Sequence, residues 1–156
     1  MASVIVSAIT VLWLVLALFF SHQGGEATAR TSGVLTDLCC RLLNRFAPES
    51  TLTAQSVDAL LRKSAHIAIF IILTALLCLS LFLLKRQRGW KIPPLAGFLF
   101  CLFFGWADEA TKIWIEGRHF SWTDVGLNAL GCCAGAAVFL IVRAIILKTG
   151  KACESR

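Results

Sequence analysis

The chain alternates between long apolar runs and short polar segments. At about 1.5 Å per residue, roughly 20 helical residues are needed to cross the ~30 Å hydrocarbon layer of a bilayer. Apolar runs of this length occur four times, at residues 2–20, 64–84, 94–115 and 122–147. The pattern therefore predicts an all-α membrane protein, built as one bundle of four transmembrane helices in a single domain over residues 1–156.

The composition agrees with a membrane protein. Of the 156 residues, 58% are hydrophobic and only 15% are charged, outside the range of ordinary soluble domains. The first run could instead be a signal peptide, with Ala27–Ala29 as its cleavage site. However, no Lys or Arg precedes it, and it is longer than the usual apolar core of about 7 to 15 residues. Ser3, Ser7 and Thr10 share one helical face, so we expect a helix that packs against others through small side chains.

Basic residues cluster between the second and third runs. The net charge is +6, and Lys85–Lys91 (KRQRGWK) holds four basic residues. The positive-inside rule places this segment in the cytoplasm, and four spans then place both termini there, in the cytoplasmic (inner) membrane. Without a nucleic-acid motif or interleaved stacking aromatics, these residues are interpreted as topology signals and contacts with membrane lipids. No nucleic-acid partner is expected.

The segment between the first two runs contains an amphipathic pattern. Apolar side chains recur at helical spacing over Val34–Phe46, with Asp37, Arg41 and Arg45 on the opposite face. This predicts a short helix that either lies on the outer membrane surface or packs as a cap over the bundle. Thr51–Ser56 then supplies N-cap residues for the helix that becomes the second run.

The seven cysteines show no spacing typical of metal ligands, and those in apolar runs are expected to pack as small hydrophobic residues. No metal and no cofactor is expected.

The stretch WADEATKIW, residues 106–114, places charges at the end of the third run. If the helix enters the membrane near Pro94, Asp108 lies about 21 Å further along it, in the outer third of the bilayer. Asp108 and Lys112 are spaced i, i+4, so one is expected to neutralise the other, with Glu109 about 100° away. Charged residues at this depth are costly, which favours a functional role for Asp108 and Glu109.

The second and fourth runs bring polar residues to the same end. Arg62, Lys63 and His66 precede or begin the second run, whereas Arg118, Asp124 and Asn128 lie in the turn and first turns of the fourth. With Glu116, the predicted cluster balances four basic against four acidic side chains, facing the bundle interior or a wet cavity.

Simpler roles are open for several of these residues. Ser121 and Asp124 fit a capping box, Asn128 can hydrogen-bond between helices, and Arg62 and Lys63 can extend to the interface. His66 can be a satisfied core histidine. Gly131 and Gly135 form a GxxxG motif, which permits close helix contact and makes a second copy of the chain a candidate partner.

The segments RKSAHIAIF, ADEATK and GRHFSWTDVGLNALGCCAG, together with FSHQGGEATARTS after the first run, resemble the successive motifs of the VanZ-like family. The resemblance covers most of the chain. It implies a small polytopic membrane protein of the cell envelope, in a family named for a member that confers low-level resistance to the glycopeptide teicoplanin. The family motif residues would be the following: Arg62, Lys63, His66, Asp108, Glu109, Arg118, Asp124, Asn128 and Gly131.

Two positions depart from the family pattern. Lys112 stands where relatives usually have Gln, and Phe70 stands where they often have Tyr, a residue this chain lacks. The lysine adds a charge to the expected site, so the ligand preference of relatives need not transfer.

Three functions are compatible with these residues, and we favour the first. In it, the polar residues form a non-enzymatic outer-leaflet pocket for a lipid, a lipid-linked precursor or a lipoglycopeptide. Arg62, Lys63 and Arg118 would contact phosphate or carboxylate, with Asp108 and Glu109 orienting them.

The second function is an intramembrane hydrolase or transferase acting on a lipid-linked substrate. His66, Asp108 or Glu109 would be the catalytic candidates, with Arg118 stabilising developing charge. The third is a transport or assembly subunit; four short spans rarely form a transporter alone, though the GxxxG motif could dimerise them.

Overall fold

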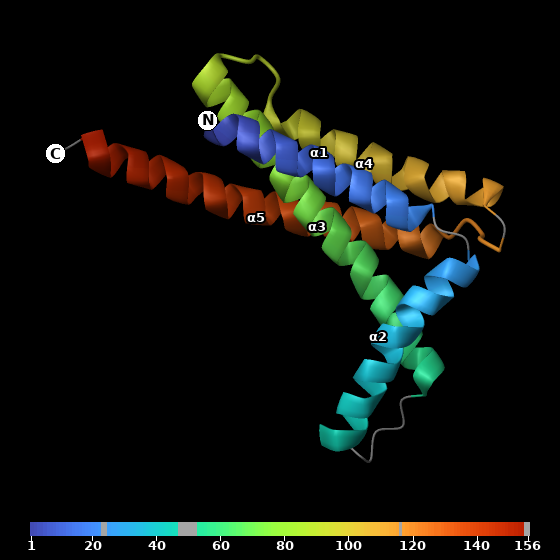
Figure 1. Cartoon of the computed structure of the whole chain (residues 1–156). Helices are drawn as coiled ribbons and strands as arrows, with labels where there is room; N and C mark the ends of the chain where they lie inside the picture. The colour runs from blue at the N-terminus through green and yellow to red at the C-terminus, as the bar shows by residue number, and fades with distance from the viewer. Residues whose placement is uncertain (23–24, 47–52, 116, 155–156) are drawn as a thin grey trace.

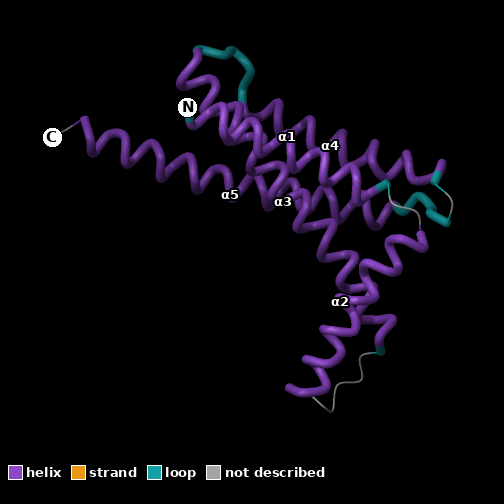
Figure 2. The backbone as a smooth tube through the Cα atoms, viewed as in Figure 1, coloured by secondary structure: helices purple, strands orange, loops and turns teal. Residues whose placement is uncertain are grey.

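The computed structural model describes residues 1–22, 25–46, 53–115 and 117–154, and its regular elements are all helices (Figures 1 and 2). In chain order these are α1 (Ala2–Ser21), α2 (Gly25–Phe46), α3 (Ala54–Arg88), α4 (Pro94–Thr111), the 3-10 turn η1 (Lys112–Trp114) and α5 (Trp122–Glu154).

Helix α3 is the centre of the bundle. It packs against α1, α4 and α5, most extensively against α5, and crosses them at an angle (Figure 1). The buried core contains Phe70, Leu73, Cys101 and Cys132. These two cysteines pack as small hydrophobic residues, as the sequence predicts.

Helix α1 packs on α3 through the predicted small-residue face. Ser3 and Thr10 are buried, and the hydroxyls of Ser7 and Ser80 are hydrogen-bonded at 2.6 Å. The Ser3 backbone N–H donates to Gln87 Oε1 at 3.3 Å. The prediction of a packed first helix is confirmed, because short polar side chains let the two backbones approach and satisfy their own hydrogen bonds.

The GxxxG motif holds α5 against α3 of the same chain. A Cβ atom on Gly131 would lie 2.7 Å from the Ile67 carbonyl oxygen, and one on Gly135 would lie 2.4 Å from that of Ile71. Only glycine fits such contacts with backbone atoms. The close helix approach expected from these glycines is therefore made within one chain, and a second copy is not needed to explain it.

Helix α3 is much longer than the apolar run that predicts it. It begins at Ala54, where Thr53 Oγ1 accepts a hydrogen bond from the Ser56 backbone N–H, in agreement with the predicted capping segment. Its 35 residues extend about 52 Å, well beyond the ~30 Å of a hydrocarbon layer. The first turns of α3 project from the bundle together with α2 (Figure 1).

Helix α2 is the predicted amphipathic helix, and it is longer than expected. Its main packing partner is α3, where Thr36 is buried and donates to Asp58 Oδ1 at 3.3 Å. Its apolar face is exposed, with side chains at the following positions: Val34, Leu35, Leu38, Leu42 and Phe46. This arrangement favours the surface helix over the cap, since a cap would bury these side chains on the bundle.

Three helical segments in the described part of the chain are long and apolar enough to cross a membrane. They are Ala2–Ser21, Ala54–Arg88 and Trp122–Thr149. The protein is therefore an all-helical membrane protein. The apolar part of α4 is diluted by the polar residues of its last turn, and α4 itself ends at Thr111, four residues before the predicted end of the third run.

Candidate functional site

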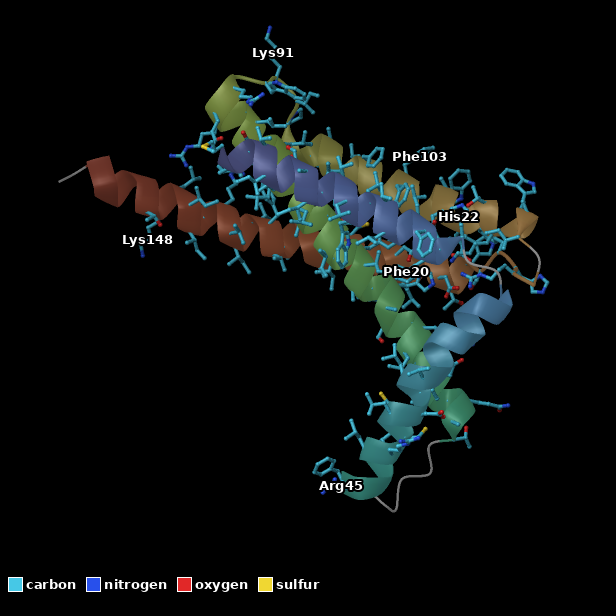
Figure 3. All side chains as sticks on the ribbon, in the orientation of Figure 1. Phe20, His22, Arg45, Lys91, Phe103 and Lys148 are labelled. Atoms are coloured by element: carbon cyan, nitrogen blue, oxygen red, sulfur yellow. The ribbon has the colours of Figure 1, made fainter. Side chains whose placement is uncertain are left out.

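The polar residues of interest lie where α1 and α4 end and α5 begins. We call this region the polar end, defined by Ser21, His66, Asp108–Lys112 and Asn128. Figure 3 shows His22 there, whereas Lys91 of the basic loop lies at the opposite end of the bundle. The helix order alone produces this gathering, because α1 and α4 run toward the same end and α5 starts from it.

The centre of the polar end is a buried ion pair. Lys112 Nζ donates to Glu109 Oε2, and both side chains are about 98% buried or more. The expected pairing of Lys112 with Asp108 is wrong. The α-helix stops at Thr111, and Lys112 enters a 3-10 turn, in which residues three apart lie above one another.

Asp108 is instead joined to α1. Ser21 Oγ donates to Asp108 Oδ2 at 2.7 Å, across 87 residues of sequence. Beside it, Thr111 Oγ1 donates to the Asp108 carbonyl oxygen at 2.8 Å and lies 3.2 Å from His22 Nε2. These contacts fasten the end of α1 to the end of α4.

Two carboxylate oxygens of this region have no hydrogen-bond partner within the protein. Asp108 Oδ1 and Glu109 Oε1 are buried, and neither is paired in the described structure. Asp108 is 6% exposed and Glu109 is 0% exposed, so bulk water does not reach them. Buried acceptors left unpaired are rare in folded proteins and require an explanation.

A second hydrogen-bonded chain links α3, α5 and α4. His66 Nδ1 lies 3.0 Å from Asn128 Oδ1, and Asn128 Nδ2 donates to the Gly105 carbonyl oxygen at 3.1 Å. A carbonyl oxygen only accepts, so Asn128 must present Nδ2 to it and Oδ1 to the histidine. In the neutral ring, His66 Nδ1 therefore carries the proton, and Nε2 has the free lone pair.

Glycine at position 105 makes this series of hydrogen bonds possible. A Cβ there would lie 3.0 Å from the Phe70 ring and 3.1 Å from Asn128 Cβ, so a larger residue would push α4 away from Asn128. The expected interhelical role of Asn128 is confirmed.

Charged groups surround His66. Lys112, Asp124 and Glu109 lie close enough to interact with it electrostatically. Asp124 is half-buried in the first turn of α5, where its backbone N–H donates to Ser121 Oγ at 3.3 Å. The predicted capping role of Ser121 is therefore confirmed. Arg118 is half-buried in the preceding turn.

Two predicted site residues lie outside this group. Arg62 is exposed and pairs with Asp58 one turn earlier, with Nη2 2.5 Å from Oδ2, and Lys63 is also exposed. Both sit where α3 projects from the bundle. The balanced cluster of eight charges is thus divided, and Glu116 lies outside the described residues.

Sequence reasoning missed Ser21, His22, Thr111 and Asp58. The first two follow the last apolar residues of the first run, but no local pattern indicates that they would meet α4. Among the described residues, no group of three or more His, Cys, Asp or Glu side chains is arranged to hold a metal ion. The described arrangement offers hydrogen-bond acceptors, one neutralised lysine and one histidine of fixed orientation.

A family model described as VanZ/LLP1 matches residues 6–143 of the chain. The match includes most of α1, all of α2, α3, α4 and η1, and most of α5, and therefore all of the polar end. No curated protein and no solved structure matches the chain.

Proposed function

We propose that this chain, which belongs to the VanZ/LLP1 family, is a four-span membrane protein that binds a lipid, a lipid-linked precursor or a lipoglycopeptide at its polar end. In this proposal the polar end lies in the outer leaflet, and both termini and the basic loop lie in the cytoplasm. The link to glycopeptide resistance comes from the family, which is named for a member that confers low-level resistance to teicoplanin.

The length of α4 supports a fourth span. Its 18 residues cover about 27 Å, and the three residues of η1 add about 6 Å. Together they match the ~30 Å hydrocarbon layer. The exposed tryptophans Trp106, Trp114 and Trp122 then lie toward one interface and Trp90 toward the other, as in an aromatic belt.

The observation that carries the proposal is the unpaired pair of carboxylate oxygens on Asp108 and Glu109. Removing an ion from water costs several kcal/mol even after the protein relaxes, and a partner offsets this cost only where the remaining acceptors are also satisfied. Here one acceptor on each carboxylate remains unsatisfied within the protein. A ligand that donates hydrogen bonds would satisfy both.

A resistance assay tests this function. Cells expressing the wild-type chain and its Asp108→Asn variant are compared for teicoplanin susceptibility and for the amount of labelled drug bound to intact cells. Asp37→Asn, on the exposed face of α2, is the matched control. We expect expression to lower susceptibility, Asp108→Asn to abolish the effect and Asp37→Asn to preserve it. If the wild-type chain changes neither quantity, the drug-related function is refuted.

One observation favours an enzyme as the second candidate. The Asn128 side chain fixes His66 with a free lone pair on Nε2, which is the arrangement a general base requires. This reading predicts turnover of a lipid-linked precursor by the purified protein and its loss in His66→Ala. No turnover across a panel of such precursors would eliminate it.

A further inference from the structure

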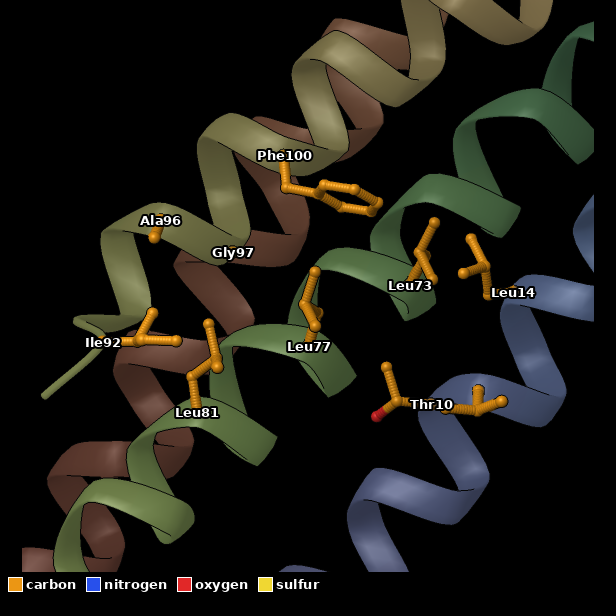
Figure 4. Close-up of a pocket in the computed structure, with 10 residues that line it drawn as sticks. Thr10, Leu14, Leu73, Leu77, Leu81, Ile92, Ala96, Gly97 and Phe100 are labelled. Carbon is orange, nitrogen blue, oxygen red and sulfur yellow. The ribbon is translucent and has the colours of Figure 1, made fainter. Parts of the chain in front are cut away.

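An apolar groove runs between α1 and α4, with α3 as its floor (Figure 4). Its volume is about 290 Å³. The lining residues come from all three helices and include Thr10 and Val11 of α1, Leu77 of α3, and Ala96 and Phe100 of α4. The Thr10 hydroxyl donates to the Val6 carbonyl oxygen, so this lining hydroxyl is already satisfied within α1.

The surroundings and the volume restrict the occupant. The groove lies between helices placed in the membrane, so the molecules that reach it are lipids, and an apolar cavity does not retain water. Pockets that enclose a drug-sized ligand are typically about 300–1,000 Å³, so 290 Å³ is too small for a whole glycopeptide or lipid. It has room for part of one, and its lining fits an acyl chain.

The groove and the polar end belong to one seam between the same two helices. Beyond the groove, α1 and α4 meet where Ser21 bonds Asp108 and His22 lies against Thr111. Phe100 lies at the end of the groove, and Asp108 lies about 12 Å further along α4. A molecule that enters the groove from the polar end would therefore place its headgroup near Asp108 and its acyl chain against α3.

The charges at the polar end favour a particular headgroup. Asp108 Oδ1 and Glu109 Oε1 are acceptors without partners, whereas the charge of Lys112 is already paired with Glu109. A phosphate alone would face negative charge. An ammonium or a hydroxyl would instead donate to the free oxygens.

We propose that the seam between α1 and α4 binds an amphiphile, with one acyl chain in the groove and a hydrogen-bond-donating headgroup at Asp108 and Glu109. The headgroup reaches the buried oxygens when Ser21 releases Asp108 and the end of α1 moves aside. This inference rests on the proposed function, because the headgroup occupies the same polar end.

Photo-crosslinking tests whether the acyl chain lies in the groove. The full chain is reconstituted into phosphatidylcholine vesicles containing a trace of phosphatidylethanolamine with a diazirine in its acyl chain. Crosslinks are then mapped by peptide mass spectrometry. We expect them to concentrate on the groove, at Val11 and Leu77, and to fall several-fold in Ala96→Phe, which fills it. Ala137→Phe, on the exposed side of α5, is the matched control and should leave them unchanged. Crosslinks spread evenly over exposed α5 positions would overturn the groove assignment.

Headgroup exchange tests the polar contact. The same diazirine-bearing acyl chain is placed in phosphatidylethanolamine, phosphatidylglycerol and phosphatidylcholine. Only the first two have hydrogen-bond donors in their headgroups, an ammonium and hydroxyls respectively. Several-fold more groove crosslinking with either donor lipid than with phosphatidylcholine supports the proposal, and the stronger of the two identifies ammonium or hydroxyl as the source. Equal capture of all three would overturn it.

Asp108→Asn separates this inference from the proposed function. It should remove the headgroup preference and keep crosslinking in the groove. If Asp108→Asn lowers capture whereas Ala96→Phe does not, the polar end binds a ligand but the groove does not hold its chain. If neither variant differs from the wild type, both proposals fail.

Discussion

Two carboxylate–cation pairs among the described residues lie in contrasting environments, and their comparison gives the most direct test of the polar end. Glu109 and Lys112 are buried, with side chains 1% and 2% exposed. Asp58 and Arg62 are 24% and 48% exposed, on the projecting part of α3. Loss of one partner should therefore have very different consequences for stability at the two sites.

The expected losses in the free energy of unfolding differ several-fold between the two pairs. Removing one member of a buried ion pair leaves a buried charge without compensation and typically costs about 3–5 kcal/mol. Exposed i, i+4 pairs contribute only about 0.3–0.5 kcal/mol. We therefore expect Lys112→Gln to lower the free energy of unfolding by about 3–5 kcal/mol. The matched Arg62→Gln should lower it by less than about 1 kcal/mol.

The assay is reversible unfolding of the purified protein in mixed detergent micelles, followed by far-UV circular dichroism. Glu109→Gln and the double variant Glu109→Gln/Lys112→Gln complete a double-mutant cycle. Because the double variant buries no unpaired charge, it should recover most of the loss caused by Lys112→Gln. If Lys112→Gln costs no more than Arg62→Gln, or if the single losses simply add, the buried pair is refuted.

Two further predictions concern packing and topology. Gly135→Ala should destabilise the bundle by about 1–3 kcal/mol through overpacking, because the new Cβ meets a backbone oxygen. Gly126→Ala, whose Cβ would have nothing within 4 Å, should instead raise the free energy of unfolding by up to about 1 kcal/mol through helix propensity. The same unfolding assay checks both, and equal effects would contradict the α3–α5 contact. If α4 spans the membrane, His119→Cys should gain labelling by an impermeant maleimide over the wild-type chain in intact cells, and Lys91→Cys should gain it only after permeabilisation. A gain for both variants from one side would refute the fourth span.

The sequence predicted the positions of helices better than their lengths. Apolar runs located α1, α4 and the start of α5, because side chains facing lipid or core must be apolar along the whole crossing. They could not show that α3 begins at Ala54, since its first turns are polar and stay helical through the Thr53 cap and the packing of α2. The capping segment, rather than hydropathy, indicates where α3 begins.

Spacing within one helix predicted faces but not partners. The predicted pairing of Lys112 with Asp108 requires the α-helix to continue, and the change to a 3-10 turn places Lys112 against Glu109 instead. The contact between Ser21 and Asp108 joins residues 87 positions apart, so no local pattern could reveal it. For Asn128 the sequence leaves open both a ligand contact and a hydrogen bond between helices, and the structure shows the bond to Gly105 of α4.

The residues that make α4 a weak candidate span are also those that form the site. A charge at the centre of a bilayer costs about 2.5–3.5 kcal/mol on insertion scales, and less toward the interface. That cost applies to a helix alone in lipid. In the folded chain Lys112 of the adjoining 3-10 turn neutralises Glu109, and Ser21 of α1 donates to Asp108, so part of the penalty that hydropathy assigns to α4 is offset. The part that remains is carried by the two unpaired oxygens. A donor headgroup there would complete the hydrogen bonding of α4, so if α4 is the proposed fourth span, ligand binding and the stability of that span should rise and fall together.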